Sequence, residues 1–373
     1  MHKTYQMCTR CIMDTTDPDI RFDDKGVCSH CHTYDTAVRS ESYLKKKMPG
    51  ALARLLENIK REGRGKQCDC VIGVSGGVDS TYTAYIVKKM GLRPLAVHLD
   101  NGWDSELAVT NIEKTLKKLD IDLYTHVLDW QEFRDLQIAF LKASTPDSEI
   151  PTDHAILAVL YMVAAQKGIR FILSGHNTAT ESGGVPSWSQ GHGDWRYIRS
   201  IHKIFGTMPL KSFPHYGPLR FIYYTLIKRI KWIPILDYFD YDKKQALEVL
   251  QNELGWKYYG AKHYESIYTR FYQGYILPHK FGFDKKICHF SSLIWSGQMP
   301  RQAALDDMAK SDYPPELQKQ DMEFVFKKLE MTGEEFERIM KQDTKSFWDY
   351  PSYKRIFYNH KWLLSAYHSL KRE

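Results

Sequence analysis

The 373-residue sequence has no long apolar run, and no apolar signal segment follows Met1. Membrane-spanning helices need roughly eighteen or more consecutive apolar residues, and secretory signals need an apolar core near the N-terminus. We therefore expect neither a membrane span nor a signal peptide, and we expect a cytoplasmic protein. The sequence also lacks internal repeats and low-complexity tracts.

Cysteine is scarce, with seven in all, and four of the seven form two close pairs. In a cytoplasmic protein such residues are metal ligands or buried thiols more often than disulfides. The pairs Cys8-x-x-Cys11 and Cys28-x-x-Cys31 have the spacing typical of a tetrahedral Zn²⁺ site. Four thiolates leave no open position for water, so the predicted role of the zinc is structural.

Two alternatives to this four-cysteine site remain open. His30 and His32 flank the last cysteine of the set and could replace one thiolate. A redox role for the Cys-x-x-Cys pairs is the weaker alternative, because no βαβ pattern surrounds them.

Neither basic nor acidic residues are in large excess. Lys and Arg total 52 against 45 Asp and Glu, a net charge of +7. This balance favours anionic partners such as nucleotides, but it is too diffuse to indicate nucleic-acid binding. The length and the 43% hydrophobic content indicate one principal domain with attached modules and a sizeable core.

A glycine-rich loop without the Walker A lysine is the most informative motif. The segment Ser75-Gly-Gly-Val-Asp-Ser80 follows an apolar strand, predicted over residues 71–74, and precedes a helix. Two glycines let an anion approach the backbone, and the serine hydroxyls and the N–H groups of a helix start supply donors. The loop matches the SGGxDS motif of the N-type ATP pyrophosphatases, which indicates a pyrophosphate site.

Strands and helices alternate after this loop. Apolar strands are predicted at 71–74, 95–99, 123–128 and 171–173, and helices at 51–61, 80–90, 105–119, 131–142 and 153–167. Alternation of this kind predicts an α/β fold with a doubly wound parallel sheet, whose ligands gather at the carboxyl ends of the strands.

Polar segments follow two of these strands, Asp100-Asn-Gly-Trp103 and Ser174-Gly-His-Asn177. Both also read as ordinary turns. Triphosphate chemistry needs Mg²⁺, which prefers oxygen ligands, and Asp79 and Glu181 are the candidate acids. Asp79 could instead cap the following helix, and Glu181 could be a solvated acid.

Together these motifs resemble the N-acetyl sugar amidotransferases of surface-polysaccharide (lipopolysaccharide, O-antigen) biosynthesis, the WbpG and PseA type within the PP-loop superfamily. A later block shares the resemblance, from Gly260-Ala-Lys-His-Tyr-Glu-Ser266 through Leu277-Pro-His-Lys-Phe-Gly282 to His289. The match covers most of residues 5–310.

The resemblance implies an enzyme that uses ATP to convert the N-acetyl group of a nucleotide-linked sugar to an acetamidino group, through an adenylylated amide that ammonia attacks. The implied cofactors and co-substrates are structural Zn²⁺, ATP and Mg²⁺. The implied catalytic residues are Asp79, Lys262 and Lys285. The nucleotide-binding set is Ser75, Gly76, Gly77, Val78, Asp79, Ser80, Asp100, Ser174, Gly175, His176, Asn177 and Glu181.

Other candidates have equally ordinary alternatives. Arg270 and Lys286 could contact phosphate or sugar acid, or be solvated charges. Trp103 and Trp188 could stack on a ring, although tryptophan is more often core. His263 and His289 could orient substrate or simply pack.

Ammonia must come from elsewhere, because the chain has no recognisable glutaminase cysteine. A separate class I glutaminase subunit is therefore expected. Residues 220–231 could be its docking surface, a membrane-surface segment or a core helix with a cationic face, and we favour the core helix.

The expected division is a zinc module with linker at 1–48, a nucleotide domain at 49–205 and a mostly helical region at 206–373 that completes the substrate site. Two other functions remain as rivals. One is a tRNA-thiolating PP-loop enzyme, which would need a thiol beside the nucleotide; Cys68 and Cys70 lead into the first strand and Cys288 lies far along the chain. The other is a non-catalytic, zinc-containing nucleic-acid-binding protein, although no nucleic-acid partner is expected.

Overall fold

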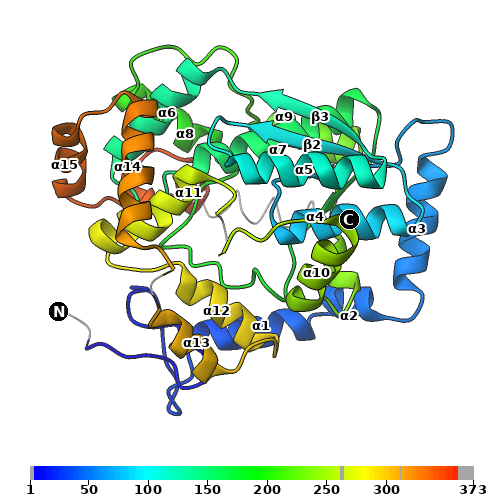
Figure 1. Cartoon of the computed structure of the whole chain (residues 1–373), viewed down its shortest axis with the longest axis horizontal. Helices are drawn as coiled ribbons and strands as arrows, with labels where there is room; N and C mark the ends of the chain where they lie inside the picture. The colour runs from blue at the N-terminus through cyan, green and yellow to red at the C-terminus, as the bar shows by residue number, and fades with distance from the viewer. Residues whose placement is uncertain (1–3, 261–263, 311, 360–373) are drawn as a thin grey trace.

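The computed structural model describes residues 4–260, 264–310 and 312–359. At its centre lies a five-stranded sheet in the order β3-β2-β1-β4-β5, and every neighbouring pair is parallel (Figure 1). The strands are β1 (Cys70–Gly73), β2 (Pro94–Asp100), β3 (Asp122–Val127), β4 (Phe171–Ser174) and β5 (Lys231–Pro234). The predicted α/β fold with a parallel sheet is confirmed.

The central strand, β1, is apolar because it is covered on both faces. Its residues Val71 and Ile72 are completely buried, and Val71 pairs with Leu95 of β2 on one side and Ile172 of β4 on the other. Continuous apolar runs of this kind are typical of parallel strands buried on both faces. The strand order reverses between β1 and β4, which places a crevice at their carboxyl ends.

Helices cover both faces of the sheet, as the doubly wound prediction requires. On one face α4 (Val78–Lys89) contacts β1, β2 and β4, and packs with α5 (Glu106–Leu119) and α10 (Lys243–Val249). On the other face α7 (Ile150–Gln166) contacts the same three strands. Each face has its own buried apolar cluster.

The fifth strand was not predicted. β5 has only four residues, lies at the edge of the sheet and ends with Pro234, so it lacks the long apolar signal of a central strand. It pairs with β4 although it belongs to the region beyond residue 206 that we expected to be mostly helical. The parallel sheet therefore includes a strand from that region.

The amino-terminal part contains α1 (Ser29–Arg39), α2 (Glu41–Lys47) and α3 (Ala51–Glu62). The last part of the segment 1–48, where a linker was expected, forms α2, which ends with three lysines. Its Lys46 donates to Asp237 at 2.8 Å, and Lys47 contacts the carbonyl of Phe239. The cations thus attach this helix to the segment after β5.

A second group of helices forms a large apolar cluster with the amino-terminal cysteines. Its helices are α6 (Trp130–Ala143), α8 (Trp195–Phe205), α11 (Ile267–Phe271), α12 (Lys286–Trp295), α13 (Arg301–Met308), α14 (Pro315–Leu329) and α15 (Gly333–Lys341). A last helix, α16 (Tyr353–Asn359), follows them in the chain. A π-helical segment, Tyr272–Phe281, continues α11, and shorter turns lie at Ile235–Tyr238, Leu250–Leu254 and Phe347–Asp349. Figure 1 shows α1, α12 and α13 gathered together, away from the sheet.

The helical carboxyl-terminal region is confirmed. A capping box begins α15, because Thr332 accepts from the N–H of Glu335 and the Glu335 carboxylate accepts from the N–H of Thr332. Phe347 and Tyr350 are buried, and the Tyr350 hydroxyl donates to the carbonyl of Ala143 at 2.8 Å. These aromatic side chains therefore pack on the main body.

Residues 220–231 do not form a core helix, so that expectation is wrong. They form α9 (Pro218–Ile222) and a π-helical turn (Tyr223–Ile227) before β5. Leu219, Leu226 and Ile227 are 84%, 70% and 68% exposed. Apolar spacing alone predicts an apolar helix face, but it does not say whether that face points toward the core or toward solvent.

No helix in the described ranges is long and apolar enough to cross a membrane.

The chain that leads to α9 is held by a buried carboxylate. Glu132 of α6 accepts from the backbone N–H groups of Lys211, Ser212 and Phe213 at 2.9–3.0 Å. We expect Glu132→Ala to lower the free energy of unfolding by about 2 kcal/mol, because these donors lose their acceptor. Urea denaturation measures the change. Glu113→Ala, at an exposed position on α5, is the matched control and should change stability little.

Candidate active site

The glycine-rich loop lies between the end of β1 and the start of α4. Gly76 has φ +83°, a left-handed conformation that glycine adopts without strain. A Cβ atom there would lie 2.9 Å from the Tyr259 hydroxyl and 3.1 Å from the Ala108 carbonyl. Ser75 and Ser80 brace the loop, with their hydroxyl oxygens 3.2 Å apart.

A segment distant in sequence fixes the orientation of this loop. The indole N–H of Trp256 and the hydroxyl of Tyr259 both donate to the carbonyl of Gly76, at 3.0 and 2.5 Å. In a planar trans peptide the C=O and the following N–H point in opposite directions. Holding the Gly76 carbonyl on one side therefore turns the N–H of Gly77 the other way, and Gly77 lines the cavity described next.

A cavity of about 550 Å³ opens at the carboxyl ends of the strands. Of the residues predicted for the nucleotide, those that line it are Ser75, Gly77, Val78, Asp79, Ser80, Ser174, Gly175, His176 and Glu181. Polar residues from the end of β2 also line it, His98, Asn101 and Asp104. The two predicted loops, after β1 and after β4, therefore meet at one site.

Because Gly175 has no side chain, the loops after β1 and after β4 can approach each other closely. A Cβ atom at this position would lie 2.9 Å from the carbonyl carbon and oxygen of Asp79 and 3.0 Å from the N of Ser80. These are backbone atoms, which cannot move aside as a flexible side chain can. The turn after β4 thus packs directly on the first turn of α4.

Three predicted residues do not line either of the two cavities described here. Asp100 accepts from the N–H of Gly102 at 2.8 Å, within its own turn. Asn177 is buried and bonds to Thr180 and the Gly175 carbonyl, so it shapes the turn. Gly76 does not line either cavity, but its left-handed backbone conformation shapes the glycine-rich loop. Lys262 and His263 lie outside the described residues.

The two candidate magnesium ligands face the same region. Asp79 accepts a hydrogen bond from the hydroxyl of Tyr241, and Glu181 lies 2.8 Å from Nδ1 of His176. Burial, followed by the charges of Asp79 and Glu181, raises the pKa of Tyr241. The carboxylate oxygens at this position are the kind of donor that Mg²⁺ takes.

His98 on β2 is a titratable group that also lines this cavity. His98 lies 2.9 Å from the Val74 carbonyl through Nδ1 and 3.1 Å from Asp104 through Nε2. Burial is the largest single influence and disfavours the charged form of His98. The hydrogen bond and charge of Asp104, the Val74 carbonyl and the charge of Asp100 together outweigh burial, so the pKa of His98 is raised above its usual value.

A second cavity of about 880 Å³ adjoins the first. The residues that line both are Asp153, His176, Glu181, Ser189, Lys243, Tyr258, Thr269, Gln273 and Lys285. Predicted Lys285 therefore stands where the two cavities meet. Arg270, Lys286 and His289 line the second cavity only.

A charged cluster that the sequence did not reveal surrounds Lys285. Its Nζ lies 3.7 Å from the buried carboxylate of Asp147. Burial favours the neutral form of Asp147, but the Lys285 charge and His192 outweigh it and lower the pKa of Asp147. Burial likewise opposes the charge on Lys285, yet Asp147 keeps the pKa of Lys285 raised. The pair is therefore ionised at neutral pH.

Asp153, beside this pair, behaves differently. Removal from bulk water raises the pKa of Asp153 to about 6, although the charge of His192, 3.4 Å away, works in the opposite direction. Ser189 also contacts Asp147 and lies 2.9 Å from Nε2 of His192. Ser189 and Asp147 thus both approach Nε2 of His192. In a hydrolase triad the serine and the aspartate approach different ring nitrogens of the histidine, so these residues do not form one.

Several predicted contacts are already satisfied within the protein. Arg270 makes a two-pronged bond to Asp321 at 2.6 and 2.7 Å, and Lys286 pairs with Asp312 at 2.8 Å. Trp103 and Trp188 are both buried, as the core interpretation predicts, and Trp188 also lines the second cavity. Trp188 stacks on Phe283 with ring centres 4.2 Å apart.

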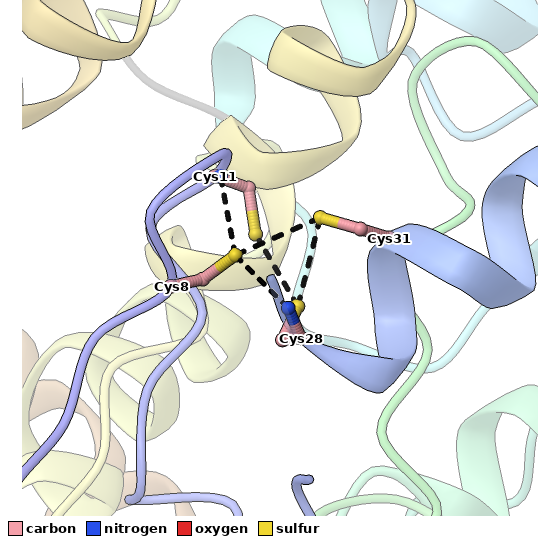
Figure 2. Close-up of side chains that lie close together, drawn as sticks. All are labelled: Cys8, Cys11, Cys28 and Cys31. Carbon is pink, nitrogen blue, oxygen red and sulfur yellow. Dashed lines mark hydrogen bonds between the residues drawn. The ribbon is translucent and has the colours of Figure 1, made fainter. Parts of the chain in front are cut away.

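The four predicted cysteines come together. Figure 2 shows their sulfur atoms pointing toward one another, and all lie within 4.8 Å of each other. Three of the Sγ to Sγ distances are 3.6, 3.6 and 3.8 Å. Tetrahedral zinc with Zn–S bonds of about 2.3 Å requires about 3.8 Å between sulfurs. The buried four-sulfur cluster therefore fits Zn²⁺.

The alternative ligands point elsewhere. His30 lies 2.7 Å from Asp17 and His32 lies 2.9 Å from Asp23. The cluster also docks on the carboxyl-terminal helices, because the indole N–H of Trp295 donates to Cys31 Sγ at 3.2 Å. Trp295 ends α12, whose first turns line the second cavity.

The parallel α/β fold and the glycine-rich loop between β1 and α4 are of the PP-loop type. Residues 265–364 match the family described as LPS biosynthesis protein WbpG-like, C-terminal domain. The chain therefore carries a WbpG-like carboxyl-terminal domain beside its PP-loop, as the sequence motifs indicated.

Curated relatives each match part of the chain. The glutamine-hydrolysing GMP synthase of Pyrobaculum aerophilum is 26% identical over 216 residues, covering 53% of this chain and 39% of that protein. The tRNA-specific 2-thiouridylase MnmA of Mesomycoplasma hyopneumoniae is 29% identical over 154 residues, covering 34% and 41%. The chain thus spans about two fifths of the length of these relatives.

Two solved structures are also similar. NMN synthetase from Francisella tularensis has a TM-score of 0.32 and 16% identity, covering 78% of this chain and 91% of that one. NH3-dependent NAD synthetase from Campylobacter jejuni has a TM-score of 0.29 and 15% identity, covering 69% and 97%.

We expect Gly175→Ala to weaken ATP binding at least about tenfold, because the new methyl group would push the turn off the Asp79–Ser80 backbone and open the site. Isothermal titration with ATP measures the effect. Gly184→Ala is the control, since no atom lies within 4 Å of a Cβ at that position of the same loop. Equal affinities for the two variants would contradict the proposed packing role.

We expect Cys28→Ser to lower the zinc content well below one ion per chain and to reduce solubility, because the cluster loses one of its four thiolates. Metal analysis of the purified protein measures this. Cys68→Ser, outside the cluster, should retain full zinc. An unchanged metal content in the first variant would rule out the four-thiolate site.

Proposed function

We propose that this protein is an ATP-dependent amidotransferase that converts an N-acetyl group of a nucleotide-linked sugar to an acetamidino group in surface-polysaccharide biosynthesis. One observation carries the proposal: a PP-loop cavity and a second, larger cavity share a wall of polar residues. The WbpG-like match over residues 265–364 supports the same substrate class, because those residues form much of the second cavity.

ATP occupies the first cavity in this proposal. Its β- and γ-phosphates rest on the loop from Ser75 to Ser80, where backbone N–H groups and the start of α4 favour anions. Asp79 and Glu181 would hold Mg²⁺, which supplies charge neutralisation at the phosphates. The sugar nucleotide occupies the second cavity, with its acetamido group directed to the shared wall.

The proposed reaction has two steps. The amide oxygen attacks the α-phosphorus, the bond to the β-phosphate breaks, and pyrophosphate leaves together with the amide proton. Ammonia then attacks the imidoyl carbon, the carbon–oxygen bond breaks, and AMP leaves to give the amidine. Adenylylation is needed because an amide oxygen is otherwise a poor leaving group.

Lys285 is the described cation best placed for this chemistry. It lies at the junction of the cavities and stays protonated beside Asp147, so its charge can stabilise the oxygens of the α-phosphate in the transition state. Asp79 acts through the phosphates. Lys262 keeps its proposed catalytic role on family resemblance alone.

A separate class I glutaminase subunit would supply the ammonia. Among the described thiols outside the cysteine cluster, Cys70 is buried in β1 and Cys68 lies just before that strand, at the end of the sheet opposite the loop. Cys288 of α12 lines the second cavity, which the sugar nucleotide occupies in this proposal.

The decisive experiment incubates the protein with ATP, ammonium and a panel of UDP- and CMP-linked N-acetyl sugars. The expected product is a sugar in which NH replaces the amide oxygen, detected by mass spectrometry, with AMP and pyrophosphate released in equal amounts. Release of ADP, or of AMP without a modified sugar, would refute the assignment.

The resemblance to tRNA 2-thiouridylases favours a second candidate, tRNA thiolation. Cys288 lines the second cavity and is the one thiol near the site among the described residues. Cys288→Ser should leave sugar-dependent pyrophosphate release intact if the protein is an amidotransferase, and should abolish thiolation if it is not.

Asp79→Asn should reduce pyrophosphate release about a hundredfold or more while the zinc content stays normal, because the neutral side chain loses its charge beside the phosphates. Asp120→Asn, at an exposed acid in a left-handed turn, is the control and should retain wild-type activity. A variant at Asp79 with near-normal release would contradict the proposed metal-binding role.

A further inference from the structure

The positive charge of the chain is concentrated in one stretch. Residues 195–236 contain no Asp or Glu and hold eight Lys or Arg, whereas the rest of the chain has 44 basic and 45 acidic residues. The net charge of the protein therefore resides in this stretch. The eight cations are Arg196, Arg199, Lys203, Lys211, Arg220, Lys228, Arg229 and Lys231.

All eight cations are exposed. None of them forms a salt bridge with a carboxylate anywhere in the described part of the chain. An unpaired positive surface of this kind attracts an extended anionic partner rather than a single counter-ion.

An apolar face accompanies the last four of these cations. Leu219, Ile222, Tyr223 and Leu226 recur at the spacing of one helix face, and all are exposed. Tyr224 and Ile230 are the buried residues that attach this segment to the body, where Tyr224 stacks on Tyr161 of α7. Few side chains of this helical segment are therefore buried, and its apolar stripe faces solvent.

We propose that residues 218–231, the basic apolar surface, bind the surface of a bilayer that contains anionic lipids. Interfacial helices insert Leu, Ile and aromatic side chains into the headgroup region while Lys and Arg contact anionic headgroups. This surface has both parts in one short segment: the apolar stripe, and four cations at Arg220, Lys228, Arg229 and Lys231.

The same features argue against a protein partner. The core of a protein interface is depleted of Lys and other charges, which are left to its rim. Here the exposed apolar side chains of Leu226 and Ile227 are followed at once by Lys228 and Arg229. A lipid surface accepts that interleaving, because each long cation can reach a headgroup while its neighbour inserts.

The basic apolar surface is separate from the chemistry. None of residues 218–231 lines either cavity. Membrane binding by this surface does not depend on the proposed function. Variants in this segment should therefore leave pyrophosphate release in vesicle-free solution unchanged.

The test is vesicle flotation with the full chain. Phosphatidylcholine vesicles containing phosphatidylglycerol should carry the protein upward, pure phosphatidylcholine vesicles should not, and high salt should release it, because ions screen the headgroup attraction. Lys228→Gln with Arg229→Gln should weaken binding about tenfold or more. Leu226→Ser with Ile227→Ser should weaken it as strongly.

Two variants on α5, one double and one single, are matched controls. Lys117→Gln with Lys118→Gln removes two exposed lysines from α5, and Val109→Ser removes an exposed apolar side chain from the same helix. Both should bind vesicles like the wild type. Zinc content and circular dichroism verify folding for every variant.

Equal binding to both kinds of vesicle, or no binding to either, would overturn the proposal. So would surface variants that bind like the wild type. If the wild type ignores vesicles while Leu226→Ser with Ile227→Ser dissociates a homodimer or a complex with a glutaminase subunit, the surface is a protein interface instead, which also refutes a lipid role.

Discussion

The site depends on one steric constraint, the contact between the turn after β4 and the first turn of α4. Gly175 has no side chain, so its backbone reaches that of Asp79 and Ser80. The contact joins the two strands at which the sheet reverses its order, and it brings Glu181 and Asp79 to one region. With any larger residue the two halves of the nucleotide cavity would separate. Parallel pairing sets the strands in register, but this contact sets the distance between their loops.

Much of this arrangement could be predicted because it depends on local sequence. The four longer signals for strands, the loop at Ser75 to Ser80 and the cysteine pairs each occupy a few consecutive residues, and each has a physical pattern of its own. The carboxyl-end rule for parallel sheets then placed the loops together. Lys285, which lines the cavity, was also predicted as a site residue from the sequence. That prediction came from the family resemblance, because no local pattern around Lys285 indicates its role.

The remainder could not be read from the sequence, because it arises from contacts between distant segments. Trp256 reaches the Gly76 carbonyl across 180 residues, and Tyr241 reaches Asp79 across 162. Asp147 owes its charge to Lys285. The solvent-facing stripe around Leu226 shows another limit: helical periodicity identifies an apolar face but carries no information on what covers it.

Two carboxyl-terminal helices attach the cysteine cluster to the rest of the protein, and Arg301 of α13 donates to the carbonyls of Cys11 and Cys8 at 2.9 and 3.0 Å. α12 bonds to the cluster through Trp295 at its end, while Lys286 and His289 near its start border the second cavity. Depletion of the metal would release that helix from its far end and leave the PP-loop strands intact. In the proposed reaction, chains made under zinc starvation would retain the cavity that takes ATP but lose part of the wall of the second cavity, which takes the sugar, so the supply of metal would control whether the sugar binds.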